Sequence, residues 1–291
     1  MKLGLVIASR GRPDILQRVL VNVLSQPRIP DDIVISAVDP EDVPEVGQSA
    51  AKVQSIFGRA GSSCQRNRGM LRLISAADVI IFIDDDFIVG DDYFLNLERI
   101  FEQDHSIIGV NGDVVADGAN SRGYTFEEGI RLAEQYGQQK KTTPFTRDIK
   151  GAYGCNMAFR SSSIGSVRFD ERLPLYGWQE DLDFCGALRG SGRIVSTNLV
   201  WGIHLGTKRS KGSEVRLGYS QIINPAYIVS KGNMSFGYAF RLASKNFLAN
   251  LAQSVRPESY IDRRGRLRGN LIGMFHLMTG RLTPEYILKL D

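Results

Sequence analysis

Three consecutive aspartates, Asp84, Asp85 and Asp86, directly follow an entirely apolar segment, residues 79–83. Adjacent carboxylates repel one another, and their burial is costly unless a cation compensates. Mg²⁺ and Mn²⁺ prefer oxygen ligands, and proteins commonly hold them through one or two carboxylates together with substrate phosphates. Because side chains alternate along an extended chain, Asp84 and Asp86 should face the same side. The triplet therefore predicts a divalent-cation site, with a solvated acidic turn as the alternative.

A second acidic group lies in residues 177–181, Gly-Trp-Gln-Glu-Asp. Acidic residues are favoured in the first turn of a helix by the helix dipole, so a helix that starts near Glu180 accounts for them without any function. That explanation leaves the preceding Gly-Trp pair without a purpose. A carboxylate held rigidly at a helix start beneath a Trp, and partly desolvated, is also suited to act as a general base.

His204 and Arg66 also lie at the ends of expected elements. His204 follows a strand-like segment, residues 194–201, and a glycine lies two residues to either side of it. A structural hydrogen bond and a ligand role are equally open for it. Two arginines near a helix start, Arg66 and Arg68, oppose the helix dipole, so they should pair with an anion or with the aspartates, with plain surface charge as the alternative. A helix start with Ser and Gly can also receive phosphate.

The elements that must position these residues alternate between strand and helix. Apolar runs predict strands at residues 3–8, 33–38, 79–83 and 107–111. A 3.6-residue periodicity predicts helices between them, at residues 13–24, 64–75 and 93–101. This alternation predicts a parallel, doubly wound sheet. Ligands on such sheets bind beyond the carboxyl ends of the strands, where Ser9, Arg10, Asp39 and the aspartate triplet fall. The fold should therefore gather these motifs at one edge.

The chain after residue 120 is less regular. Strands are expected around a helix that starts near Glu180, loops are expected in two polar segments, and helices are expected from Tyr238 onward. The strands should lie at 151–159 and 194–201, and the loops at 135–146 and about 206–235.

Composition and charge limit the class of protein. Of 291 residues, 43% are hydrophobic, which suits a globular α/β protein. The net charge of +4 is too small to argue for nucleic acid, and from Arg241 onward nine Lys and Arg face four Asp and Glu. Three widely spaced cysteines form neither a disulfide framework nor a zinc pattern. With no signal peptide and no spanning apolar run, we expect a cytoplasmic protein.

Together, these residues resemble family 2 glycosyltransferases over roughly residues 2–206. The resemblance rests on five segments. Residues 6–13 look like the first strand and nucleotide loop, and residues 61–69 are similar to a Gly-x-x-x-Ala-Arg-Asn-x-Gly segment with Gln65 in place of Ala. Residues 84–86 match a DxD metal site, residues 154–160 look like the strand beside the acceptor pocket, and residues 177–181 resemble a Gly-Trp-x-Glu-Asp element. Asp39 sits where the family has a base-contacting aspartate, although Pro40 replaces the usual acidic-Gly-Ser turn.

The resemblance implies a GT-A fold, a Rossmann-like and mostly parallel sheet flanked by helices. We expect a catalytic domain at 1–206, with a nucleotide-binding half at about 1–110 and an acceptor half at 111–206, and a loop and basic helical extension at 207–291. The implied roles are catalytic base for Asp181; acceptor binding for Glu180, Trp178 and Asn156; nucleotide binding for Ser9, Arg10, Arg12, Asp39, Arg66, Asn67, Asp84 and Asp85; and metal binding for Asp86, Asp84 and His204.

The implied activity is inverting, Mn²⁺- or Mg²⁺-dependent transfer of a sugar from a nucleotide donor to a hydroxyl of a glycan. UDP is the expected nucleotide, the acceptor is expected to be lipid-linked, and the pathway to be exopolysaccharide biosynthesis. One alternative is a nucleotidyltransferase that makes the sugar nucleotide, although the Gly-Trp-x-Glu-Asp element has no role there. Another is a non-catalytic, membrane-associated assembly module, against which the intact triplet argues.

The basic tail suggests a second property. Four arginines, at 263, 264, 266 and 268, precede an apolar stretch, residues 271–278. Basic residues beside a short apolar helix suit an anionic membrane surface, and so predict peripheral binding to the inner membrane face. A C-terminal helix packed on the domain is the equal alternative.

Overall fold

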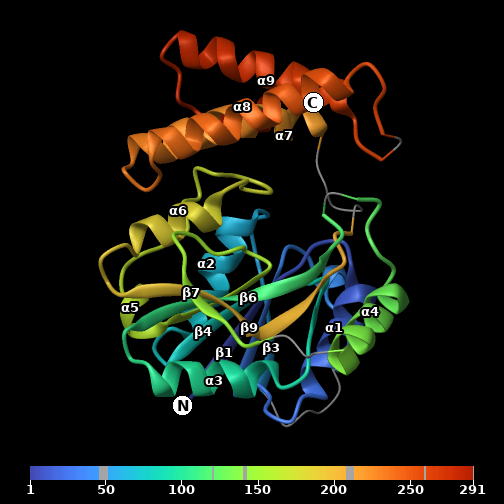
Figure 1. Ribbon diagram of the computed structural model, residues 1–291, viewed down its shortest axis with the longest axis vertical. Helices are drawn as coiled ribbons and strands as arrows, with labels where there is room; N and C mark the ends of the chain where they lie inside the picture. The colour runs from blue at the N-terminus through green and yellow to red at the C-terminus, as the bar shows by residue number, and fades with distance from the viewer. Residues whose placement is uncertain (46–51, 120, 140–142, 208–212, 259, 291) are drawn as a thin grey trace. The chain divides into compact units, whose positions relative to one another are not determined.

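The computed structural model describes residues 1–45, 52–119, 121–139, 143–207, 213–258 and 260–290 (Figure 1). The chain forms two compact units, and we describe each by itself. The first comprises Met1–Ala60, Gln65–Arg168 and Leu188–Ser210, and the second comprises Gly61–Cys64, Phe169–Ala187 and Lys211–Asp291. The functional division at residue 206 stays a prediction.

The first unit is built on one mixed sheet with the strand order β3-β2-β1-β4-β8-β6-β9-β5, and β7 pairs with β9. The strands are β1 (Leu3–Ala8), β2 (Asp32–Ala37), β3 (Lys52–Phe57), β4 (Val79–Asp84), β5 (Phe87–Val89), β6 (Ile107–Asp117), β7 (Thr146–Asp148), β8 (Asn156–Arg160) and β9 (Arg193–His204). Strands β3, β2, β1 and β4 are parallel, as the sequence predicted for β2, β1 and β4. In the other half, β8 is antiparallel to β4 and β6, whereas β6 and β9 are parallel.

Strand β3 was not predicted from the sequence. It lies at the edge of the sheet, and its side chains are exposed or half-buried. An edge strand with no fully buried face does not need the continuous apolar run that marks a central strand such as β1 or β4. The interval between the predicted elements at 33–38 and 64–75 therefore contains a strand.

The register of the sheet brings three strand ends to one level. Ala8 of β1 pairs with Ser36 of β2 on one side and with Asp84 of β4 on the other. On the far side of the sheet, β5 and β9 pair antiparallel, with Phe87 opposite His204. The common edge predicted from the alternation of strands and helices is therefore confirmed.

Five helices among the described residues accompany this sheet: α1 (Pro13–Leu24), α2 (Ser62–Leu73), α3 (Tyr93–Gln103), α4 (Phe126–Gln139) and α5 (Ser161–Ile164). The apolar stripes of α1 and α3 are buried in the core of the sheet, which includes Leu16, Val19, Phe94 and Leu97. Residues 135–139, predicted to begin a loop, instead end α4. A helix that buries only one face needs few apolar residues, so its polar end was mistaken for a loop. Residues 140–142 lie outside the described residues.

The second unit is helical in the described part. Its helices are α6 (Glu180–Ala187), α7 (Glu214–Ser230), α8 (Phe236–Gln253) and α9 (Arg263–Met278), followed by a short 3₁₀ helix, η2 (Pro284–Lys289). The prediction of a loop over residues 206–235 was wrong for Glu214–Ser230, which form α7, and residues 208–212 lie outside the described residues. Helix α7 is buried on nearly all sides, including the polar Ser220, Gln221 and Asn224, so it lacks an amphipathic pattern.

Close contact between α7 and α9 depends on glycine. A Cβ placed on Gly269 would lie 2.0 Å from the carbonyl oxygen of Val215, and one on Gly218 would lie 2.0 Å from that of Arg266. The amide of Asn270 also donates to the Gly218 carbonyl oxygen over 2.7 Å. In the part of the chain that the structure describes, no helix has both the length and the apolar character to cross a membrane.

Candidate active site

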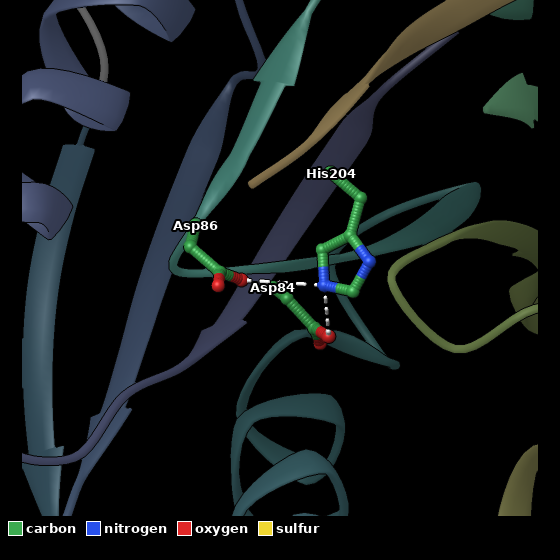
Figure 2. Close-up of side chains that lie close together, drawn as sticks. All are labelled: Asp84, Asp86 and His204. Carbon is green, nitrogen blue, oxygen red and sulfur yellow. Dashed lines mark ion pairs between the residues drawn. The ribbon is translucent and has the colours of Figure 1, made fainter. Parts of the chain in front are cut away.

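Asp84, Asp86 and His204 converge at the common edge of the first unit (Figure 2). Asp84 ends β4, Asp86 lies in the turn before β5, and His204 ends β9. The Nε2 atom of His204 lies 3.5 Å from Oδ1 of Asp86 and 3.9 Å from Oδ2 of Asp84. One ligand atom from each residue lies within 4.8 Å of the others. Two carboxylate oxygens and one imidazole nitrogen fit a divalent cation such as Mn²⁺.

The orientation of Asp86 is fixed through one of its two oxygens. Oδ2 accepts hydrogen bonds from the backbone N–H of Thr207 (2.7 Å) and from Nη1 of Arg12 (2.9 Å). Burial alone would raise the pKa of Asp86, but its hydrogen bond with His204 and the charge of Arg12 outweigh burial and hold that pKa well below its usual range. The residue is therefore ionised, and Oδ1 faces His204.

Asp85 points into the protein and organises the loop after β1. Its side chain has no exposed surface, accepts a hydrogen bond from the Ser9 hydroxyl (2.7 Å) and forms an ion pair with Arg12. Burial raises the pKa of Asp85 to about 7, although the charge of Arg12 opposes this. Ser9, Arg12 and Asp85 were predicted to bind nucleotide. The structure joins them to one another, and their nucleotide role stays a prediction.

Arg66 connects α2 to the aspartates. Its Nη2 atom donates to Oδ1 of Asp84 (3.0 Å) and to the carbonyl oxygen of Gly154 (3.1 Å), and the side chain is buried. Of the partners left open by the sequence, the aspartates are confirmed. Gly154 leaves room for this contact, since a Cβ there would lie 2.8 Å from Nη2. Asn67, the next residue of α2, is also buried.

Asp117 is a site residue that the sequence analysis missed. Its Oδ1 atom lies 2.8 Å from Nδ1 of His204, and its Oδ2 accepts a hydrogen bond from the Tyr153 hydroxyl over 3.2 Å. A carboxylate on one imidazole nitrogen fixes the ring and directs the other nitrogen to a metal. Burial would lower the pKa of His204, but hydrogen bonds with Asp117 and Asp86 outweigh it and raise that pKa to about 10, so a cation that binds Nε2 must displace a proton. Asp117 ends β6, as Asp84 ends β4, but β6 extends six residues beyond the strand predicted from the sequence, so this strand end was not recognised.

Asp42 is a second missed residue, and it joins the loops after β1 and β2. It ends a 3₁₀ helix, η1 (Pro40–Asp42), and its carboxylate accepts from the backbone N–H groups of Gly11 (2.5 Å), Val38 (3.2 Å) and Asp39 (3.0 Å). Asp42 is buried, whereas Asp39 and Arg10 are exposed. Asp39 and Arg10 are thus available at the surface of the first unit, and their nucleotide-binding roles stay predictions.

The predicted base, Asp181, belongs to the second unit. It is the second residue of α6, is half-buried, and accepts from the backbone N–H of Leu182 over 2.8 Å. Glu180 begins the helix, as predicted, and is buried. The preceding Gln179 has a φ of +75°, which is strained for a residue other than glycine. The backbone that presents Asp181 therefore has a sharply defined conformation.

The remaining predicted acceptor residues differ in exposure. Trp178 is half-buried, and its carbonyl oxygen accepts from the amide of Asn224 over 2.8 Å. Asn156 of β8 has no exposed surface, and its Oδ1 accepts from the hydroxyl of Tyr93. The structure thus gives Asn156 a core contact rather than an open one. The acceptor roles of both residues stay predictions.

Comparisons with known proteins place this geometry in context. A family model described as "Glycosyltransferase like family 2" matches residues 2–168. A search of curated proteins gave no match.

Three solved structures are similar over nearly the whole chain. GalNAc-T7 with UDP, GalNAc and Mn²⁺ is 13% identical, with a TM-score of 0.52, and the match covers 100% of this chain but 56% of that one. Residues 1–349 of S. aureus TarS with UDP-GlcNAc are 11% identical, with a TM-score of 0.56 and coverages of 100% and 84%. The mannosyltransferase PcManGT from Pyrobaculum calidifontis with GDP-Man and Mn²⁺ is 12% identical, with a TM-score of 0.52 and coverages of 99% and 85%. At such low identity, the likeness concerns the fold.

Proposed function

Since this chain belongs to the glycosyltransferase-like family 2, we propose that it transfers a sugar from a nucleotide donor at a cation site formed by Asp84, Asp86 and His204. The GT-A fold and the transferase class expected from the sequence are confirmed by the family match and the similar structures. The observation that carries the proposal is the convergence of these three side chains from three separate strand ends.

The metal cofactor is part of the proposal. When bound, a divalent cation neutralises charge on the diphosphate leaving group. Two of the similar structures contain Mn²⁺, and the ligand set here, with two carboxylates and an imidazole, supports the same type of ion. We propose Mn²⁺ or Mg²⁺ as the cofactor.

The chain's own residues prepare this site in two ways. Thr207 and Arg12 hold one oxygen of Asp86, so the other stays directed towards His204. Arg66 holds Asp84 through a 3.0 Å contact, and its position at the second turn of α2 supports an additional role beside an anionic donor.

The proposed reaction is a single displacement with inversion. Asp181 takes the proton from the acceptor hydroxyl while that oxygen attacks the anomeric carbon, and the nucleoside diphosphate leaves. No carboxylate nucleophile is needed in such a step, in contrast to a retaining double displacement. The half-buried carboxylate at the start of α6 supports this role.

Donor and acceptor follow from weaker support. The similar structures contain UDP, UDP-GlcNAc or GDP-Man, which supports a nucleotide sugar, and we propose UDP as the nucleotide. We propose a glycan hydroxyl as the acceptor, on a lipid-linked intermediate of polysaccharide biosynthesis at the cytoplasmic face of a membrane.

The donor can be identified without the acceptor. A thermal-shift screen of nucleotide sugars should give a raised Tm with one UDP-sugar in the presence of Mn²⁺, and the rise should disappear when the metal is chelated. An unchanged rise under chelation would contradict the cation site. Release of pyrophosphate from a nucleoside triphosphate and a sugar phosphate would instead identify a nucleotidyltransferase.

The stereochemical outcome tests the proposed reaction course. With the identified donor and a glycan acceptor, proton NMR of the early product should show an anomeric configuration opposite to that of the donor. Retention would exclude the single displacement and would leave the transferase class intact.

A further inference from the structure

Helix α8 leaves a row of large apolar side chains exposed. Phe236 is 74% exposed and Phe240 is 64% exposed, and their rings stack with centroids 6.1 Å apart. Leu248 and Leu251 continue the row at helical spacing, and the exposed Val255 follows just beyond the end of the helix. The buried residues of α8, Ala239 and Asn250, lie together on a different flank of the helix. The row therefore faces away from the interior of the second unit.

Helix α9 presents a second row of the same kind. Five exposed residues follow one another at intervals of four, three, four and three, which places them on one face: Arg264, Arg268, Leu271, Phe275 and Met278. The opposite face contains Gly265, Gly269 and Gly273, all buried. The exposed face of α9 is thus basic in its first half and apolar in its second half.

The two helices lie side by side within the second unit (Figure 1). The amide of Asn250 on α8 donates to Oδ1 of Asn270 on α9 over 2.9 Å. After the end of α8, the carbonyl oxygen of Ser254 accepts from Nε of Arg264 over 3.1 Å. We refer to the exposed rows together as the α8–α9 face, which comprises Phe236, Phe240, Leu248, Leu251, Val255, Arg264, Arg268, Leu271, Phe275 and Met278.

The charge on this face has one sign. Residues 236–256 and 263–283 contain no acidic residue. Two of the nearby carboxylates are paired, Glu258 with Arg263 and Glu214 with Arg266, and a third, Asp262, accepts from the backbone N–H of Gly265 at the start of α9. In the described part of the chain, Arg264 and Arg268 have no carboxylate partner. The free positive charge is therefore concentrated beside exposed Leu and Phe side chains.

We infer that the α8–α9 face binds the surface of an anionic lipid bilayer. Amphipathic helices with Phe and Leu on one side and Lys or Arg beside them insert their apolar side chains at the headgroup boundary, while the cations contact anionic lipid. A second copy of this chain is a poorer occupant, because two identical faces would bring like charges together. This inference goes beyond the proposed transfer reaction and does not depend on it.

Flotation of the full chain with vesicles tests the inference. The unmodified protein should bind vesicles that contain phosphatidylglycerol and should bind phosphatidylcholine vesicles much more weakly. R264E/R268E should weaken binding to the anionic vesicles by about tenfold or more, since each arginine near the surface contributes on the order of 1 kcal/mol. F240S/F275S should weaken binding by a similar factor. Two first-unit variants, R99E and L71S, change exposed residues of the same types and should bind normally.

Several outcomes would overturn the inference. Equal binding of R264E/R268E and R99E would do so, and so would equal binding to both vesicle types. If R264E/R268E does not fold, as judged by circular dichroism, the salt dependence of the unmodified chain decides: binding must weaken as salt is added, because exposed charges are screened. A dimer in solution that F240S/F275S dissociates would assign the face to self-association instead. Vesicle binding needs no donor, so its failure is distinct from a failure of sugar transfer.

Discussion

Two clusters of acidic residues, Asp84–Asp86 in the first unit and Glu180–Asp183 in the second, have different environments. Asp86 and Asp183 are equally buried, each with 2% of its surface exposed. Both oxygens of Asp183 are engaged in the second unit, Oδ2 by Lys231 and Oδ1 by Asn233. Asp86 commits one oxygen to Thr207 and Arg12 and directs the other towards His204. Burial does not distinguish the two carboxylates, whereas their partners do: Asp183 faces an ammonium and an amide, and Asp86 faces an imidazole that could bind the same cation.

Asp181 differs from both. It is half-buried, and a backbone N–H contacts one of its oxygens. A proton acceptor needs access to its substrate, and a fully enclosed carboxylate such as Asp183 has none. The comparison supports the tasks that we propose: metal binding for Asp86, proton transfer for Asp181 and stability for Asp183.

The largest expected effect comes from D86N. The amide removes a charged ligand, so Mn²⁺ binding should be lost and transfer should fall by about 10³-fold. Calorimetric titration with Mn²⁺ and steady-state kinetics measure the two quantities. D183N is the matched control, and its folded fraction should retain nearly normal kcat. Equal losses in both variants would remove the distinction between the two groups.

The next effect is expected for D181N. It should lower kcat by about 10²- to 10⁴-fold, because a general base contributes on that scale. Donor and Mn²⁺ binding, followed by calorimetry, should change little. Full activity in D181N would show that the base lies elsewhere, and weakened metal binding would conflict with its assignment to proton transfer.

A smaller effect should follow from D117N. Loss of the carboxylate that orients His204 should weaken Mn²⁺ binding by about 10- to 100-fold, as is typical when the partner of a metal-bound imidazole is removed. Calorimetry again provides the measurement, independent of activity. Y153F is the control. The Tyr153 hydroxyl contacts Asp117 over a longer 3.2 Å, so its removal should weaken Mn²⁺ binding less than D117N does. Unaltered affinity in D117N would make Asp117 a purely structural partner.

The smallest effect on function, and the clearest on stability, should come from K231M. Lys231 contacts Asp170 and Asp183, so its loss should lower the free energy of unfolding by about 2 kcal/mol at neutral pH, with kcat nearly unchanged. Burial opposes the ionisation of Asp170 and of Lys231, but the contact between these two side chains lowers the pKa of Asp170 and raises that of Lys231.

The pH dependence of the K231M effect has a defined sign. Stabilisation through Asp170 is present above the unfolded-state pKa of 3.8 and is lost as the pH falls through its lower folded-state pKa. Stabilisation through Lys231 is present below 10.5 and is lost as the pH rises through its higher folded-state pKa. Urea unfolding should therefore show the largest difference between K231M and the unmodified protein from about pH 4 to 10, and a smaller one in stronger acid. A constant difference would contradict the ion pair.

The sequence predicted the parts of this molecule that depend on local pattern. The apolar runs located β1, β2 and β4, and the rule that ligands bind beyond strand ends predicted one edge for Ser9, Asp39 and the aspartate triplet. The expectation of a metal role for His204 came from the family resemblance. The sequence-based prediction failed where contacts with neighbouring elements determine the secondary structure. Strand β3 is stabilised by pairing at a half-exposed edge, and α7 is enclosed by other helices, so neither has the usual periodicity.

The missed site residues have the same explanation. Asp117 is 87 positions from His204 in the chain, and Asp42 is 31 positions from Gly11. Each is one acidic residue among many in the sequence, and only the pairing of distant strands selects it. A motif can identify a ligand, but the residue that orients the ligand becomes visible only when the register of the sheet is known.

The buried glycines of α9 have a consequence for the side of the helix that they do not touch. At Gly269 the two backbones of α9 and α7 approach so closely that even a methyl group has no space. A helix in such contact cannot roll about its axis without separating from its neighbour. The glycines on the buried face of α9 thus determine which of its residues, Phe275 among them, are exposed.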